Sequence, residues 1–172
     1  GRFPGIVLAV KKDKAAQVKS FADLKGLKIG VTAPGSSTNF FVMYLMVKNG
    51  LKADDASFIR VGAGPTAVAA VKRGEIDAIS NLDPVITKLE QDGAIKIIAD
   101  WRTVKGTEQT FGGQLPAGSL YAPTKIVKEN PRTAQALTNA IVRANKWVAN
   151  ASATDVAKVV PEAYLLGDRA LY

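Results

Sequence analysis

The sequence predicts an α/β protein with a mainly parallel sheet of about five strands flanked by helices. Two observations predict this fold class. Runs rich in valine, isoleucine and leucine alternate with segments of helical pattern over the first hundred residues or so. Glycines follow most of the helical segments, and prolines or small polar residues precede several of them, which marks the element boundaries. Strands connected through helices in this way usually pair in parallel, with the helices covering the sheet.

The first half of the chain supplies three apolar, β-branched runs that are typical of strands, at residues 5–12, 27–32 and 56–62. Between the first two, Ser20 to Gly26 predicts a single helical turn, with the serine as N-cap and the glycine as stop. The segment from about Ser37 to Asn49 predicts a helix that ends at Gly50.

Further along, the prolines of Gly64-Pro65 and Asp83-Pro84 stand where helices begin, and these two helices end at Gly74 and Gly93. Each is followed or preceded by an apolar run, so strands are predicted at residues 75–80 and 94–100. The alternation therefore continues as strand, helix, strand up to residue 100.

The last part of the chain does not continue the alternation of strands and helices. Residues 101–117 hold three glycines and a proline and are predicted to be a loop, and residues 119–123 a short strand. A long amphipathic helix is expected to begin at Pro131, with Leu137, Ile141 and Val148 on its apolar stripe. A short helix should follow from Thr154 to Val160.

Composition excludes several functions. The chain has no cysteine and no histidine, so thiol catalysis, disulfides, histidine-based catalytic triads and the common zinc sites are all impossible. No S-x-x-K or Walker pattern occurs either. We therefore expect a protein that is not an enzyme and that uses neither a metal nor a cofactor. The longest apolar run, Phe40 to Val47, is far too short to span a membrane.

The formal net charge of +8 leaves two interpretations open. It can favour an anionic partner, or it can belong to a solvated surface without a specific role. The basic residues are scattered and aromatic residues are few, which argues against a nucleic-acid-binding surface.

Three junctions between a strand and the next helix are rich in small or polar residues: Pro34 to Thr38, Gly62 to Thr66 and Ser80 to Asp83. In parallel sheets such junctions gather at the carboxyl edge, where ligands bind. Helix N-termini offer N–H groups without an intrahelical acceptor and the positive end of a dipole, which suit an anion. The sequence therefore predicts an anion-binding crevice along this edge.

The residues Gly35, Ser36, Ser37 and Thr38 are the strongest ligand candidates, although such residues at a helix start often serve only as an N-cap. A cap needs one hydroxyl, and three hydroxyls exceed that need. Asp83 can likewise be either a ligand residue or a cap, and Asn81 either a ligand residue or a turn residue. The neighbouring Phe40, Phe41, Met43 and Tyr44 are expected in the core, and Trp101 and Trp147 are expected to be packing residues.

Four stretches resemble a known family when taken in order: "FADLKGLKIGVTAPGSST", Gly50-Leu51-Lys52, "AVKRGEIDAISNLDP" and "LYAPTKIVKENPRTAQAL". They are similar to the periplasmic solute-binding proteins of ABC transporters in the nitrate, sulfonate, taurine and bicarbonate class, also called NMT1/THI5-like. The resemblance implies a periplasmic or otherwise extracytoplasmic, membrane-attached protein. Its partners would be a small, anionic solute and a transporter permease.

The resemblance also implies a fold of the type II periplasmic-binding-protein kind, with the ligand held between two lobes. Residues 1–19 would be a hinge strand and the segment after it, and 20–117 the second ligand-binding lobe. Residues 118–172 would be the return hinge strand and helices of the first lobe, most of which would precede Gly1. The strand at Ile6 to Val10 and the helix from Pro131 would then present bare apolar faces, open to self-association.

Among the candidate site residues, Gly35 to Thr38 match the family's Gly-Ser segment, which holds the anionic head of the ligand. Asp83-Pro84 matches a "W-D-P" element, with Leu82 in the place of the tryptophan, and Asn81 takes another position that faces the cleft. Two alternatives stay open: a ligand-sensing domain of a regulator or sensor, and an enzyme similar to thiamine-pyrimidine synthases, which are thought to use an active-site histidine.

Overall fold

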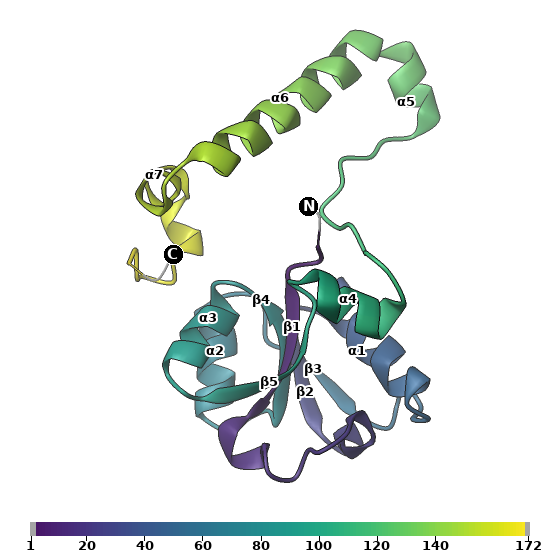
Figure 1. Ribbon diagram of the computed structural model, residues 1–172, viewed down its shortest axis with the longest axis vertical. Coiled ribbons are helices and arrows are strands. Elements are labelled where there is room, and N and C mark those ends of the chain that lie inside the picture. The colour runs from purple at the N-terminus through teal and green to yellow at the C-terminus, as the bar shows by residue number, and fades with distance from the viewer. Residues whose placement is uncertain (1–2, 171–172) are drawn as a thin grey trace. The chain divides into compact units, whose positions relative to one another are not determined.

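The computed structural model describes residues 3–170, which divide into two compact units (Figure 1). The first unit comprises residues 3–117 and carries the sheet, and the second comprises residues 118–170 and is helical. Among the described residues, no helix is both long enough and apolar enough to cross a membrane.

The sheet of the first unit has five strands in the order β3-β2-β4-β1-β5. Their bounds are β1 Ile6–Lys11, β2 Lys28–Val31, β3 Ser57–Arg60, β4 Ala78–Leu82 and β5 Ile95–Asp100. Strand β2 pairs in parallel with β3 and with β4, whereas β1 lies antiparallel between β4 and β5. Four strands therefore run in one direction, as expected of a mainly parallel sheet, and β1 alone runs against them.

Strand β1 lies inside the sheet, and its residues from Val7 to Val10 are completely buried. Helices cover both faces of the sheet, so side chains on both sides of β1 meet apolar neighbours. This position explains why its sequence is a continuous apolar run. The expectation that this strand would present a bare apolar face is wrong, because β4 and β5 flank it and both of its faces are packed.

Helices α1 (Ser37–Lys48) and α4 (Val104–Phe111) cover one face, and α2 (Pro65–Lys72) and α3 (Val85–Gln91) cover the other (Figure 1). Two short 3-10 turns, η1 (Lys12–Lys14) and η2 (Phe21–Leu24), lie between β1 and β2. Ser20 caps η2 as predicted, in a capping box with Asp23.

Helix α4 lies within the segment that was expected to be a loop. Its N-cap is Thr103, whose Oγ1 accepts from the Gly106 N–H at 3.0 Å. Trp101 just before it is fully buried, as expected of a packing residue, and its Nε1–H donates to Thr110 Oγ1 at 2.9 Å. The sequence does not indicate this helix, because the segment is polar, has a glycine at its centre and buries threonines in place of apolar side chains.

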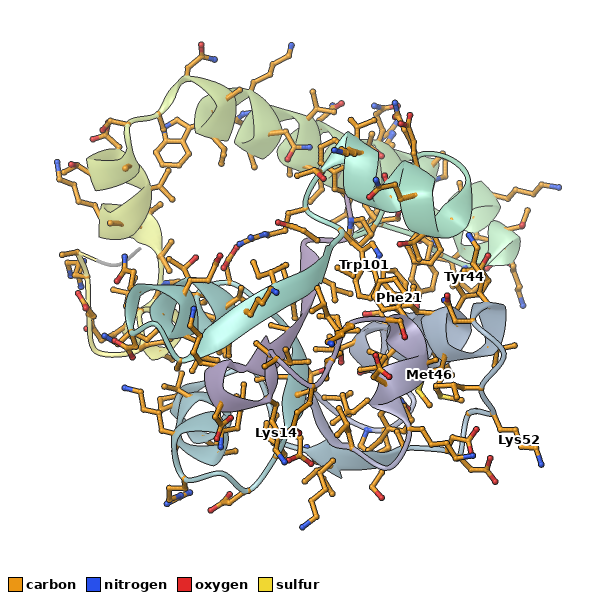
Figure 2. The ribbon with its side chains drawn as sticks, turned by 60° about the horizontal axis from the view of Figure 1, so that its bottom comes forward. Lys14, Phe21, Tyr44, Met46, Lys52 and Trp101 are labelled. Atoms are coloured by element: carbon orange, nitrogen blue, oxygen red, sulfur yellow. The ribbon has the colours of Figure 1, made fainter. Side chains whose placement is uncertain are left out.

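The prediction that Phe40, Phe41, Met43 and Tyr44 are core residues is wrong for two of them. Phe40 and Tyr44 are 57% and 46% exposed, and the other two are half-buried. Helix α1 lies on the surface of the sheet and buries only one stripe, which includes Val42, Leu45 and Met46. Tyr44 stacks instead on Phe111 of α4, with ring centroids 5.3 Å apart, and Figure 2 labels Tyr44 with Trp101 on this side of the sheet.

The second unit contains α5 (Thr124–Glu129), α6 (Pro131–Asn150), α7 (Ala153–Val159) and η3 (Glu162–Tyr164). The long helix from Pro131 is confirmed, and none of its residues is buried, so its apolar stripe is bare as expected. The short strand predicted at residues 119–123 is wrong, because this stretch is irregular. Trp147 is 45% exposed, which contradicts the expectation that it is a packing residue.

Candidate functional site

The three strand–helix junctions meet at one edge of the sheet, as predicted. Strands β2, β3 and β4 run parallel, and α1, α2 and α3 begin directly after their carboxyl ends. The side chain of Asn81 at the end of β4 joins two of the junctions, because its Nδ2–H donates to the Gly62 carbonyl at 2.8 Å. The carboxyl edge of β2, β3 and β4 is therefore the candidate site.

The turn from Gly35 to Thr38 brings β2 into α1. Gly35 has a φ of +77°, in the left-handed region, and a Cβ there would meet nothing within 4 Å, so the backbone is openly accessible at this point. Ser36 is the N-cap in an extended conformation, and its carbonyl accepts from the N–H groups of Asn39 and Phe40. The N–H groups at the start of α1, those of Ser37 and Thr38 included, have no intrahelical acceptor.

Two of the three predicted hydroxyls brace this turn internally. Thr32 Oγ1–H donates to Ser36 Oγ at 3.0 Å, and Thr38 Oγ1 lies 2.9 Å from the Thr32 hydroxyl and 2.7 Å from the Ser36 hydroxyl. Thr38 is buried and also accepts from the Thr32 N–H at 3.0 Å. No hydroxyl of this group makes a side-chain cap of α1. Ser37 is different, because it is exposed and makes no such bond among the described residues.

Asn39 is a polar residue that sequence reasoning missed. It lies on the buried face of α1 with Val42 and Met46 and is only 5% exposed. Its Oδ1 accepts from the Gly35 N–H at 2.9 Å, which fixes the orientation of the amide. The Nδ2 then has no partner among the described residues, and neither has the buried hydroxyl of Ser80 in β4. Buried donors are rarely left unpaired, so such groups point to a functional site or to bound water.

Asn81 is fully buried at the end of β4. Besides its bond to Gly62, its Oδ1 accepts from the Leu82 N–H at 2.9 Å. Both ends of the amide are therefore engaged, and the bond from its Nδ2–H holds the β3–α2 junction against β4. This geometry makes Asn81 a brace of the candidate site.

The prediction that Asp83 is an N-cap is wrong, because Pro84 takes that position in α3 and Asp83 lies one residue before it. Its Oδ1 accepts from the N–H and the hydroxyl of Thr87, at 3.1 and 2.7 Å, and so holds the first turn of α3. Its Oδ2 lies 3.4 Å from the guanidinium of Arg102. Both carboxylate oxygens thus have partners within the chain.

Arg102, just beyond the end of β5, is the centre of a charge cluster. Its Nε and Nη2 donate to the two oxygens of Asp100 at 3.0 and 2.9 Å, and its Nη1 lies 3.4 Å from both Asp83 and Glu90. These acids raise the pKa of Arg102, with the hydrogen bond to Asp100 as the main cause. Burial alone would raise the pKa of Asp100, but the bonds from Arg102 outweigh it and lower that pKa.

The acidic side chains of this cluster surround an arginine, which already supplies their counter-charge. Within residues 3–170 no group of three or more acidic side chains is arranged to hold a metal ion. The candidate site therefore offers the backbone N–H groups at the start of α1, the exposed hydroxyl of Ser37 and the carboxylate of Asp83, which Arg102 neutralises, at the ends of three parallel strands.

Comparison with known proteins shows which family the chain belongs to. The family model described as the NMT1-like family matches residues 5–161. The nitrate/nitrite binding protein NrtA of Nostoc sp. (strain PCC 7120) is 26% identical over 149 residues, which cover 81% of this chain and 30% of NrtA.

Solved structures share the fold of this chain. A protein of Bordetella bronchiseptica RB50 is 60% identical with a TM-score of 0.94, over all of this chain and 54% of its own. The alkanesulfonate-binding protein SsuA of Xanthomonas axonopodis pv. citri, solved with bound MOPS, shares the fold at 23% identity and a TM-score of 0.67, over 99% of this chain and 58% of its own. The chain thus spans less than two thirds of each of these relatives. With the family model matching most of its length, the chain belongs to the NMT1-like family.

Proposed function

We propose that this chain belongs to the substrate-binding component of an ABC importer and takes part in capturing a small anion. Its relatives include proteins named for binding nitrate or nitrite and alkanesulfonates. The observation that carries the proposal is the start of α1, where an open glycine turn presents backbone N–H groups at the carboxyl edge of the sheet. The mechanism is binding followed by closure, without a chemical step.

The chemistry of the turn favours an oxyanion such as a sulfonate, nitrate or carboxylate. Free N–H groups and the helix dipole both stabilise negative charge at this position. The exposed hydroxyl of Ser37 can donate to the anion without giving up an internal bond. The hydroxyls of Ser36 and Thr38 hold the turn in shape, which preorganises the donors. Asn81 and Asp83 have the same supporting role in the two neighbouring junctions.

The division into lobes is part of the same proposal. Residues 20–117 would form the second ligand-binding lobe together with the hinge strand of residues 1–19. Residues 118–172 would contribute the return crossing and helices of the first lobe, and the whole would act outside the cytoplasm with a permease. Support comes from the compact sheet unit of residues 3–117 and from the solved relatives, whose chains are longer.

Replacing Ser37 with alanine is the sharpest test at the site. We expect affinity for methanesulfonate or nitrate to fall about tenfold, because a hydrogen bond to a charged group contributes about 1.5–3 kcal/mol. The free energy of unfolding should change by less than about 0.5 kcal/mol, since the side chain is exposed. Isothermal titration calorimetry measures the first quantity and urea denaturation the second.

Ser57→Ala is the matched control, because Ser57 is also exposed but begins β3 at the opposite edge of the sheet. It should leave both quantities unchanged. If Ser37→Ala binds both anions with wild-type affinity, the Ser37 hydroxyl is not a ligand group. If the wild-type chain binds neither anion at about 10 mM, ten times an expected Kd of about 1 mM, the proposed function itself is wrong for this chain.

A further inference from the structure

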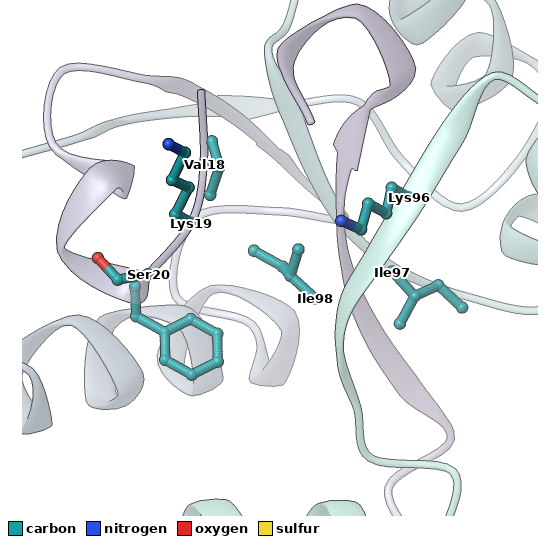
Figure 3. A pocket seen from close by; sticks show the side chains of 7 residues that line it. Val18, Lys19, Ser20, Lys96, Ile97 and Ile98 are labelled. Carbon is teal, nitrogen blue, oxygen red and sulfur yellow. The ribbon is translucent and has the colours of Figure 1, made fainter. Parts of the chain in front are cut away.

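A second concave feature lies away from the candidate site, beside the edge strand β5. It is a hollow of about 260 Å³ between β5 and the segment that leads into η2, and Figure 3 shows it from close by. Its lining residues come from those two segments alone: Val18, Lys19, Ser20, Phe21, Lys96, Ile97 and Ile98. None of them has a role in the anion site at α1.

Strand β5 is open on one side along this hollow. Within residues 3–170 it pairs only with β1. The Lys12 N–H donates to the Ala94 carbonyl and the Trp101 N–H donates to the Ile6 carbonyl, so these two positions face β1. The register with β1 shifts between Leu8 and Ala9, opposite Ile97 and Ala99, so the alternation of backbone groups is followed from Ala94 only as far as this irregularity. Over that part of β5, Ile95 and Ile97 turn their N–H and C=O groups to the free side. Such an edge is a template for an additional strand.

The floor of the hollow is apolar and its rim is basic. Val18 is 8% exposed, and Phe21 and Ile98 pack against the same core. Lys19 and Lys96 are exposed on the rim, and neither has an ion-pair partner among the described residues. The nearby carboxylate of Asp23 is held by the N–H groups of Lys19 and Ser20 and by the Ser20 hydroxyl. The rim therefore carries the two positive charges of Lys19 and Lys96, and the one nearby negative charge, that of Asp23, is already hydrogen-bonded.

The volume helps to decide what fits. Sites for small molecules usually measure about 300–1,000 Å³, so a hollow of about 260 Å³ suits one side chain better than a whole ligand. A peptide that adds a strand to a sheet edge is recognised by two features. Main-chain hydrogen bonds provide the affinity, and pockets for single side chains provide the specificity. A lysine on the edge also repels a second copy of β5 and attracts a carboxylate placed opposite it.

We infer that the β5 edge and its hollow form a docking site for an extended, acidic peptide segment of a partner protein. The segment pairs with the free backbone groups of Ile95 and Ile97 and places one apolar side chain against Val18, Phe21 and Ile98. Its carboxylates face Lys19 and Lys96. This inference does not depend on anion binding at α1.

The test uses a fluorescein-labelled nine-residue peptide of alternating glutamate and valine with serine ends, titrated with the full 172-residue chain in fluorescence anisotropy. Saturable binding with a Kd below about 1 mM is expected. The double variant Lys19→Glu/Lys96→Glu should weaken it at least tenfold. The matched double variant Lys52→Glu/Lys105→Glu makes the same charge change at two other exposed lysines and should retain wild-type affinity.

A second peptide carries N-methyl groups on its valines, which removes the main-chain N–H donors of those residues while keeping the charges and side chains. It should bind at least tenfold more weakly than the parent peptide. The inference is overturned if the parent peptide does not bind, or if both lysine double variants lose affinity equally, which indicates general charge attraction. Equal affinity of the N-methylated peptide would overturn strand addition. Complete displacement of the peptide by sodium hexanoate would show a small-molecule site in its place.

Discussion

Replacing Gly106 with alanine is expected to destabilise the first unit by about 3 kcal/mol. A Cβ at this position would overlap the backbone carbonyl of Asp100, and a carbonyl at the end of β5 cannot move aside as a flexible side chain can. In an open helix the same substitution would stabilise by about 1 kcal/mol, so the expected sign is opposite to that of helix propensity. Urea denaturation measures the difference.

Gly113→Ala is the control for this prediction. Gly113 has no atom within 4 Å of its would-be Cβ and does not adopt a positive φ, so this variant should remain within about 0.5 kcal/mol of the wild type. If Gly106→Ala is as stable as Gly113→Ala, then α4 does not approach the end of β5 as closely as described.

Replacing Arg102 with methionine should cost about 2 kcal/mol. The change keeps much of the side-chain volume but leaves Asp83, Glu90 and Asp100 gathered without their counter-charge. Removing one partner of a buried ion pair costs about 3–5 kcal/mol, and we expect less because the Arg102 side chain is 26% exposed. Arg73→Met, which breaks an exposed pair with Glu75, should cost less than about 0.5 kcal/mol.

Acid pH provides an independent signature of the same cluster. Since Arg102 holds the pKa of Asp100 below its ordinary value, Asp100 contributes stability above the unfolded-state pKa of about 3.9. That contribution is lost as the pH falls through the lower pKa of the folded state. The stability difference between wild type and Arg102→Met should therefore shrink below about pH 4. A difference that stays constant from pH 7 to pH 3 would mean that Arg102 acts by packing alone.

Much of the sheet unit could be predicted because apolar runs and helix boundaries are local signals. The direction of β1 could not, since a continuous apolar run indicates burial on both faces but carries no information on direction. Helix α4 was missed for a different reason. Its stabilising contacts, such as the bond between Trp101 and Thr110, exist only in the folded chain and leave no apolar period in the sequence.

In the candidate site, too, features with a local sequence signal could be predicted and those that depend on folding could not. The turn from Gly35 to Thr38 was predictable because helix starts have a chemical signature. The distinction between Ser37, which is exposed, and Thr38, which is buried, depends on the tertiary bonds to Thr32. Asn39 could not be recognised as a site residue, because it lies at the start of an apolar helix and nothing in the sequence distinguishes it there. Arg102 meets Asp83 and Glu90 only through folding, since 19 and 12 residues separate them along the chain.

The central claim is that the start of α1 holds an anion, and an amide chemical-shift titration tests it most directly. The ¹⁵N-labelled chain is titrated with methanesulfonate and, separately, with sodium chloride at equal ionic strength. We predict saturable shifts of the amide signals of Ser36, Ser37 and Thr38 at about 10 mM methanesulfonate, with smaller changes elsewhere. Chloride should not reproduce them. Saturable shifts that cluster at another part of the sheet unit, or no shift at these three amides, would contradict the claim.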